Sequence, residues 1–119
     1  MSRAEEDSNR RMLRARDEMD RAYGEQLDIP ALARIAKVSE GHFIRTFRAT
    51  FGETPHRYIT RVRLERARAL LRGTRSVAEV ALECGFESVG SFTTLFARRY
   101  GCPPGRFRKN EEEPRLEHA

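Results

Sequence analysis

The chain is short and carries a net positive charge. It has 119 residues, of which 39% are hydrophobic and 34% are charged, and its net charge is +5. This length fits one structural unit or two very small ones joined together. The sequence has no secretory core at its N-terminus and no apolar run near the roughly 18 residues of a membrane span. We therefore expect a cytoplasmic protein.

The N-terminal part predicts two helices. Residues 1–8 are polar and are expected to fray, whereas apolar residues recur at helical spacing from about 9 to 24. The first helix is amphipathic and needs a partner that covers its apolar side. Asp28 is a typical N-cap for a second, short helix over 29–36, which a tight turn follows.

The middle of the chain predicts a further short helix and then a long one. Ser39 caps a helix over about 40–51, and Gly52 is placed to end it in the left-handed conformation. A Thr-Pro pair then opens a helix over about 55–72 that ends at Gly73. The residues of this long helix expected to face inward are Tyr58, Ile59, Val62, Ala69 and Leu70. The arginines expected to face water or a ligand are Arg57, Arg61, Arg68 and Arg72.

The C-terminal part repeats the same local signals. A Ser-Val-Ala-Glu capping box at 76–79 opens a helix that breaks at Gly85. Ser88 caps the next helix, which Gly101 ends. A Pro-Pro pair opens a last short helical turn, and residues 110–119 are expected to be disordered. No segment has a strand pattern, so we predict an all-α fold of about seven helices.

Two segments of the chain resemble each other. Phe43–Gly52 returns 49 positions later as Phe92–Gly101, with aromatic residues four apart followed by a glycine. Short helix, tight turn and second helix form a helix-turn-helix, and the repeat indicates two of them. We therefore predict helix-turn-helix subdomains over 9–53 and 74–109, joined by a long linking helix over 54–73 and followed by the tail.

Positive charge is concentrated in the repeats. Residues 1–39 carry eight basic and eight acidic side chains, residues 40–109 carry fourteen and six, and residues 110–119 carry one and four. Lysines and arginines set against phosphates displace condensed counterions, so this distribution suits a polyanion partner. A solvated arginine-rich surface is the alternative that composition leaves open.

In both copies the second helix has an aromatic edge and an opposite edge. The aromatic edges consist of Phe43, Phe47 and Phe51 in the first copy and Phe92, Phe96 and Tyr100 in the second. The opposite edges display Glu40, Gly41, Ile44, Arg45 and Arg48 in the first copy, and Val89, Gly90, Thr93, Thr94, Ala97 and Arg98 in the second. A glycine inside a helix costs roughly 1 kcal/mol relative to alanine. Gly41 and Gly90 thus indicate either close approach to a DNA surface or simple tolerance near a helix start.

The second repeat carries a demanding spacing, Ala-x3-Gly-Phe-x4-Ser-Phe-x3-Phe-x4-Gly-x2-Pro-x3-Arg. Its residues are Ala81, Gly85, Phe86, Ser91, Phe92, Phe96, Gly101, Pro104 and Arg108. This pattern resembles the C-terminal signature of the AraC/XylS transcriptional regulators. The first repeat is similar to the upstream repeat of the same domain through Leu32, Ala33, Ser39, Phe43, Phe47, Phe51, Gly52, Pro55, Tyr58, Ile59, Arg63, Ala67, Leu70 and Leu71. The resemblance covers about residues 9–109.

The resemblance implies a sequence-specific DNA-binding regulator, by the family's habit an activator. Two helix-turn-helix units would insert their second helices into adjacent major grooves of double-stranded DNA, with the protein acting as a monomer and recruiting RNA polymerase. Base contacts are then expected from Glu40, Gly41, Ile44, Arg45, Val89, Gly90, Thr93 and Thr94. Phosphate contacts are expected from Ser39, Arg48, Arg57, Arg61, Ser88, Arg98, Arg99 and Arg106.

These side chains differ in how well they can distinguish one base pair from another. Arg45 suits a bidentate contact to guanine, and Ile44 and Val89 suit thymine methyl groups. The second helix lacks Arg, Gln and Asn at its first exposed positions, so we expect discrimination mainly from the first repeat. His42, near the start of the first reading helix, is expected to be structural or merely exposed rather than to contact DNA.

Other classes of protein fit less well. Cys84 and Cys102 have neither metal nor redox spacing, and no phosphate-binding loop or activated nucleophile is present. We therefore predict no enzyme, no cofactor and no metal site; a fused DNA-repair methyltransferase would also need a longer chain. A protein-interaction module that docks on RNA polymerase or an acidic partner, with only weak DNA binding, stays open because of the poorly equipped second helix.

Overall fold

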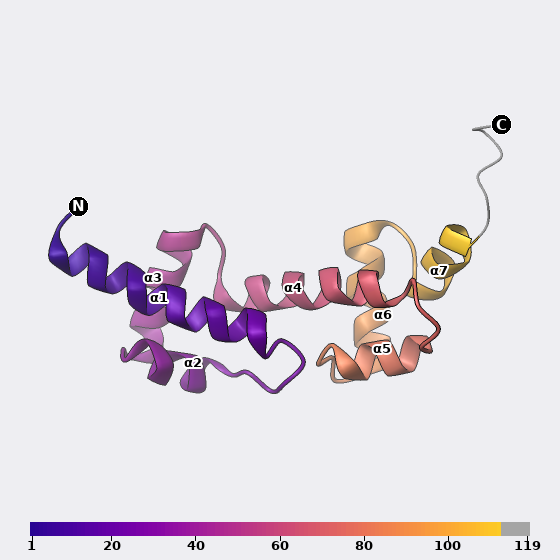
Figure 1. Cartoon of the computed structure of the whole chain (residues 1–119), viewed down its shortest axis with the longest axis horizontal. Coiled ribbons are helices and arrows are strands. Elements are labelled where there is room, and N and C mark those ends of the chain that lie inside the picture. The colour runs from indigo at the N-terminus through magenta and orange to yellow at the C-terminus, as the bar shows by residue number, and fades with distance from the viewer. Residues whose placement is uncertain (113–119) are drawn as a thin grey trace. The chain divides into compact units, whose positions relative to one another are not determined.

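The described part of the protein is built from helices joined by short loops. The computed structural model describes residues 1–112, and in that range it contains seven helices and no strand (Figure 1). The helices are α1 (Arg3–Arg21), α2 (Ile29–Ala36), α3 (Glu40–Phe51), α4 (Pro55–Leu70), α5 (Val77–Glu83), α6 (Val89–Tyr100) and α7 (Pro104–Glu112). The expected all-α fold is confirmed. Within residues 1–112, no helix has both the length and the apolar character needed to cross a membrane.

The helices fall into two compact units, and the division lies inside α4, after Val62. The first unit contains α1, α2, α3 and the first part of α4. The second contains the rest of α4 with α5, α6 and α7. The first and last parts of α4 thus belong to different units. The division into subdomains 9–53 and 74–109 with a linking helix over 54–73 stays a prediction. Each unit contains one helix-turn-helix pair, α2–α3 or α5–α6.

The core of the first unit forms where α1 contacts both α2 and α3. It consists of Met12, Ala15, Met19, Leu32, Ala33, Ala36, Phe43, Phe47, Tyr58, Ile59 and Val62. The ring centroid of Phe47 lies 5.6 Å from those of Phe43 and Tyr58. Aromatic pairs of this kind add about 0.5–1.5 kcal/mol beyond the area they bury. The aromatic edge of α3 is thereby held against the core, which leaves its opposite edge outside.

The N-terminal helix begins earlier than the apolar periodicity indicated. We expected residues 1–8 to fray, but α1 starts at Arg3 and ends at Arg21. The side chain of Ser2 accepts a hydrogen bond from the backbone N–H of Glu5 at 3.1 Å. Glu5 and Glu6 in the first turn also interact favourably with the positive end of the helix dipole. Capping and charge thus extend the helix beyond its apolar stripe.

The turn between α2 and α3 is fixed by local hydrogen bonds and one left-handed residue. Asp28 accepts from the backbone N–H of Ala31 at 2.8 Å and caps α2, as expected. The turn itself uses Lys37 at a φ of 59°. Ser39 then caps α3, and Gly52 ends it at a φ of 81°. The second helix of the pair therefore begins and ends at the predicted residues.

The second unit repeats this arrangement around a second aromatic cluster. Ser76 caps α5, Gly85 turns the chain at a φ of 87°, and Ser88 caps α6. Phe92 and Phe96 are fully buried. Arg108 on α7 donates from Nε to the carbonyl oxygen of Leu71 at 2.9 Å and thus ties α7 to the end of the α4 segment.

Two expectations for this part of the chain are wrong. Ala69 is exposed and Leu70 is only half-buried. The buried residues of the later part of α4 are Leu64 and Ala67, and Leu71 is buried directly after the helix. The apolar stripe of the first part does not continue because the second unit buries a different set of side chains. The last helix, α7, also runs to Glu112, whereas we expected disorder from residue 110. The rest of that predicted tail, 113–119, lies outside the described residues.

Candidate nucleic-acid interface

The second helix of the first pair presents one side to solvent. Phe43 and Phe47 on α3 are fully buried. The residues predicted on the opposite edge are all exposed, and we call them the first reading face: Glu40, Gly41, Ile44, Arg45 and Arg48. Ile44 retains 38% of its surface although it is apolar. The face therefore combines cations with an exposed aliphatic group, as reading of base edges requires.

Arg45 lies back over the first turn of its helix. A Cβ atom placed on Gly41 would lie 3.1 Å from Nη1 of Arg45. Long side chains on helices point toward the N-terminus, so a residue covers the turn that precedes it. Among the described residues, no carboxylate forms an ion pair with this guanidinium. Arg45 is thus an exposed cation with its hydrogen-bond donors directed to the N-terminal end of α3.

The corresponding face of α6 carries shorter side chains. Ala97 was predicted on this edge but is half-buried, so we define the second reading face by the other predicted residues: Val89, Gly90, Thr93, Thr94 and Arg98. All of them are exposed except Thr93, which is half-buried, so Thr93 is less available than expected. Val89 retains 44% of its surface. Near Gly90, the closest atom to an added Cβ would be Oγ of Ser88 at 3.8 Å.

The two N-cap serines remain available to a phosphate although each already has a partner. Ser39 Oγ accepts from the backbone N–H of His42 at 3.2 Å, and Ser88 Oγ accepts from that of Ser91 at 3.0 Å. Both serines are exposed. A hydroxyl that accepts one hydrogen bond can still donate its own proton. A helix N-terminus is in addition favourable for an anion.

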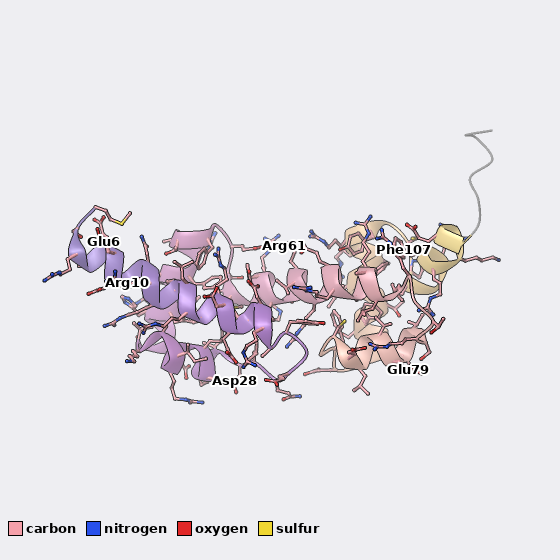
Figure 2. All side chains as sticks on the ribbon, viewed as in Figure 1. Glu6, Arg10, Asp28, Arg61, Glu79 and Phe107 are labelled. Atoms are coloured by element: carbon pink, nitrogen blue, oxygen red, sulfur yellow. The ribbon has the colours of Figure 1, made fainter. Side chains whose placement is uncertain are left out.

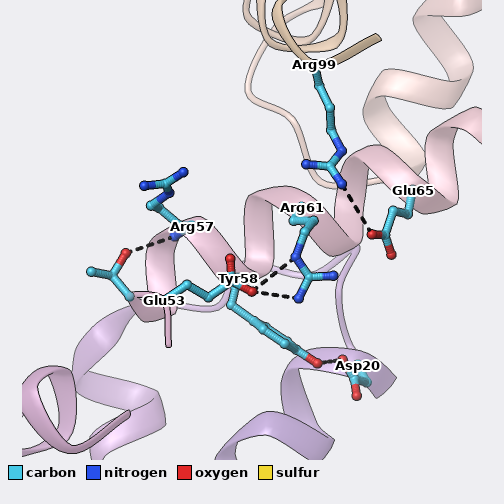
Figure 3. A network of polar contacts seen from close by, with 8 residues as sticks. Asp20, Glu53, Arg57, Tyr58, Arg61, Glu65 and Arg99 are labelled. Atoms are coloured by element: carbon cyan, nitrogen blue, oxygen red, sulfur yellow. Dashed lines mark hydrogen bonds and ion pairs between the residues drawn. The ribbon is translucent and has the colours of Figure 1, made fainter. Parts of the chain in front are cut away.

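The arginines expected to contact phosphate divide into two groups. Arg61, which projects from α4 (Figure 2), donates to Glu53 at 2.6 Å, and Arg99 lies 3.6 Å from Glu65 (Figure 3). The other four, Arg48, Arg57, Arg98 and Arg106, are exposed and form no ion pair among the described residues. A phosphate would have to compete with a carboxylate at Arg61 and Arg99, so these two are the weaker candidates.

The side chains with shifted pKa values lie in the cores rather than on the reading faces. Burial raises the pKa of the Cys84 thiol to about 11, which disfavours the reactive thiolate at neutral pH. Burial also lowers the pKa of Arg63 on the same unit. The described residues bring together no group of three or more His, Cys, Asp or Glu side chains that would suit a metal ion.

The chain matches a known family over most of the part that the structure describes. The model of a helix-turn-helix domain family matches residues 32–110. A solved AraC-type DNA-binding protein from Chromobacterium violaceum has a TM-score of 0.78 and 28% identity over 91% of this chain and 97% of its own. The chain belongs to the AraC/XylS family.

Two further comparisons describe the relatives of this AraC/XylS chain. The DNA-binding domain of AdpA, a global transcriptional factor solved in complex with a target DNA, has a TM-score of 0.82 and 30% identity, covering 85% of this chain and 92% of that domain. The transcriptional activator RhaS from an Enterobacter species is 34% identical over 91 residues, which is 76% of this chain and 33% of that protein. The chain spans 28–34% of the length of the curated relatives it matches.

In this AraC/XylS chain, further exposed residues lie beside the predicted members of the two reading faces. His42 and Ala49 on α3 are exposed beside Arg45, and Ser91 on α6 is exposed beside Thr94. The helical period could have found them, because positions 42, 45 and 49 lie opposite the buried Phe43 and Phe47. His42 is exposed, which agrees with one of the two expectations for it, and the sequence predicted no role on these faces for Ala49 and Ser91.

Proposed function

We propose that this chain is the DNA-binding part of a transcriptional regulator that acts in the cytoplasm on specific duplex sequences. The observation that carries the proposal is the repeated unit. In each copy a serine-capped helix is anchored by two fully buried phenylalanines and keeps its opposite side in solvent. The AraC/XylS membership, with a relative solved on a target DNA, supports the same conclusion.

In this proposal α3 and α6 enter successive major grooves of one duplex. Base contacts come from the first reading face, where Arg45 donates to O6 and N7 of a guanine and Ile44 touches a thymine methyl group. The second reading face contributes through Val89 and Thr94, which make apolar and weak polar contacts. Discrimination therefore depends mainly on α3, and α6 mainly fixes the position of the protein.

Phosphate contacts supply much of the affinity. Ser39 and Ser88 lie at helix N-termini, where hydroxyl and backbone donors and the helix dipole favour an anion. The exposed cations Arg48, Arg57, Arg98 and Arg106 add long-range attraction, and Arg61 and Arg99 contribute only after release from their carboxylates. Each phosphate neutralised releases counterions, so binding weakens steeply as salt is raised.

We further propose that the chain binds DNA as a monomer and that it acts by recruiting RNA polymerase. Two reading helices in one chain give two half-sites without a partner subunit. Activation rather than repression is supported by a relative that is named an activator. The chain spans about a third of the length of this relative, and the recruitment of RNA polymerase is therefore proposed for this chain and not taken from the relative.

The proposal is tested by selecting bound duplexes from a random pool with the purified protein. We expect one strongly enriched block, read by α3, and a more weakly enriched block about one helical turn (~34 Å) away, contacted by α6. Affinity for that duplex should fall linearly in log–log form with salt concentration. Recovery of no enriched sequence at any salt concentration would contradict the proposal.

The alternative function expected from the sequence can be separated by experiment. The second reading face has no side chain capable of a bidentate base contact apart from Arg98, which is far from the helix start. In this alternative the chain docks on RNA polymerase or another acidic protein and binds DNA weakly. The two are separated by competition: a specific DNA-binding protein keeps its selected duplex in the presence of excess random DNA, whereas the docking module releases it.

A further inference from the structure

The two repeats place a glycine at the same point of their reading helices, one turn before Arg45 in α3 and one turn before Thr94 in α6. Gly41 and Gly90 are each the second residue of their helix. Neither has the positive φ that would require glycine, unlike Gly52 and Gly101. The backbone therefore does not explain why a residue with poor helix propensity stands at these positions.

The surroundings of the two glycines differ. A Cβ on Gly41 would lie 3.1 Å from Nη1, 3.9 Å from Cζ and 4.0 Å from Nη2 of Arg45. The whole guanidinium thus lies across the surface that a side chain at position 41 would occupy. At Gly90 the residue one turn later is the short Thr94, and an added Cβ would meet only Oγ of Ser88, at the ordinary contact distance of 3.8 Å.

We propose that Gly41 is a positioning residue that sets the conformation in which Arg45 reads its base. The absent side chain leaves room for the guanidinium beside the first turn of α3, the part of a recognition helix that contacts base edges. The guanidinium can lie in this position only while no Cβ occupies the surface beside it, because such a Cβ would be 3.1 Å from Nη1. This inference rests on the proposed function, and it makes Gly41 a determinant of specificity although glycine has no side chain that contacts DNA.

The competing explanation is close approach of the helix backbone to the DNA. Both glycines would serve that purpose equally, because both are exposed near the N-terminus of a reading helix. Of the two glycines, only Gly41 lies one helical turn before an arginine. Alanine should raise the helix propensity at either position, but only at position 41 should it displace a guanidinium.

The experiment compares Gly41→Ala with Gly105→Ala on the selected duplex and on the same duplex with 7-deazaguanine at the base read by Arg45. The modified base lacks the N7 acceptor. The wild-type protein should prefer guanine, but by less than the roughly 5- to 150-fold discrimination of a complete bidentate pair, because O6 of the modified base still accepts from Arg45. Gly105→Ala is the control, because Gly105 is the second residue of α7 and an added Cβ there would meet no atom within 4 Å, so this variant should keep that preference. Gly41→Ala should instead bring the ratio of the two affinities close to one. Thermal unfolding should show that both variants are folded, with melting temperatures at or above that of the wild type.

A double-mutant cycle completes the test. In an Arg45→Ala background, adding Gly41→Ala should leave affinity for both duplexes unchanged, because the group that it displaces is gone. If Gly41→Ala retains the guanine preference, or if both alanine variants lose affinity alike, Gly41 is not a positioning residue. If the wild-type protein selects no duplex at all, it is the proposed function that fails. The two failures are thus distinguishable.

Discussion

Arg45 and Arg48 lie on the same face of one helix, yet their environments predict different effects on DNA binding. Arg45 lies over Gly41 at the start of α3, where base edges are reached, and Arg48 is nearer the end of the helix. Cations at the start of a recognition helix discriminate, and cations along its flank attract phosphates. The same charge therefore serves sequence preference in one case and general affinity in the other.

Substitution should separate these two roles. Arg45→Ala should cost about 1–3 kcal/mol on the selected duplex and relax the preference at one base pair. Arg48→Ala should weaken binding to all duplexes by a similar factor and lower the log–log salt slope by about one. The base preference and the salt slope of each variant are measured by titrating it with the selected duplex and with single-base variants of that duplex at several salt concentrations. Unchanged selectivity in Arg45→Ala would show that the reading face is wrongly assigned.

Two tyrosines occupy contrasting polar environments. The hydroxyl of Tyr58 donates to Asp20 at 2.6 Å (Figure 3), whereas the buried hydroxyl of Tyr100 has no hydrogen-bond partner among the described residues. The first repeat has Phe51 at the position of Tyr100, so the fold accommodates a ring without a hydroxyl there. Because an unsatisfied buried hydroxyl costs about 1–3 kcal/mol, Tyr100→Phe should leave the free energy of unfolding unchanged or raise it. Tyr58→Phe should lower it by about 1 kcal/mol. Chemical denaturation of the two variants measures the difference.

The hydrogen-bonded tyrosine also predicts a dependence of stability on pH. The pKa of Tyr58 is raised from 10.0 to about 12. Burial is the larger cause, and the hydrogen bond to Asp20 is the second. The folded state therefore keeps the phenolic proton where the unfolded chain loses it. This contribution is complete below pH 10 and is lost as pH rises toward 12. Wild type should lose more unfolding free energy than Tyr58→Phe between pH 9 and pH 11.5. Cys84 shifts in the same sense in both proteins, so it cancels in the comparison; equal losses would contradict the assignment.

At the scale of the helices, each serine cap starts a reading helix and is also proposed to contact a phosphate. Ser39 accepts from the backbone N–H of His42 and is exposed at the end of α3 proposed to meet phosphate. A cap needs an oxygen acceptor, which aspartate also provides, whereas contact with a phosphate needs a proton donor and no negative charge. The two demands can therefore be separated at one residue.

Two substitutions of Ser39 test this separation. Ser39→Ala removes the cap and should lower the free energy of unfolding by about 1 kcal/mol. Ser39→Asp should keep the stability of the wild type and lose affinity for DNA, because its carboxylate repels the phosphate backbone. Thermal unfolding and duplex binding of both variants provide the measurements. Tight binding by Ser39→Asp would place the N-terminus of α3 away from the backbone.

Local chemistry explains which elements could be predicted from the sequence. Asp28, Ser39 and Gly52 act through bonds and dihedral angles within a few residues, so the bounds of α2 and α3 follow from sequence alone. The burial along α4 does not, because Ala69 was expected inside but is exposed, while the second unit buries Leu64 and Ala67 instead. The role proposed for Gly41 could not be predicted either. It depends on where the Arg45 side chain lies, and helical periodicity does not determine that position.

At the scale of the whole molecule, the link between the two units is a continuous helix. The boundary between the units falls after Val62, inside α4, which has 16 residues. At about 1.5 Å per residue such a helix is about 24 Å long and cannot lengthen while it remains helical. A flexible linker would tolerate a range of distances between half-sites, and we predict that a helical link tolerates fewer.

The spacing of the half-sites should therefore be strict. Inserting five base pairs between the two blocks of the selected duplex rotates one block to the opposite side of the DNA, and affinity should fall to that of a duplex with one block. Inserting ten base pairs restores the side but adds about 34 Å, which is more than α4 spans, so affinity should not recover. Titration of the original, five-insert, ten-insert and single-block duplexes decides the point. If the ten-insert duplex binds as tightly as the original, α4 does not link the two reading helices rigidly, and the two units bind DNA as independent modules.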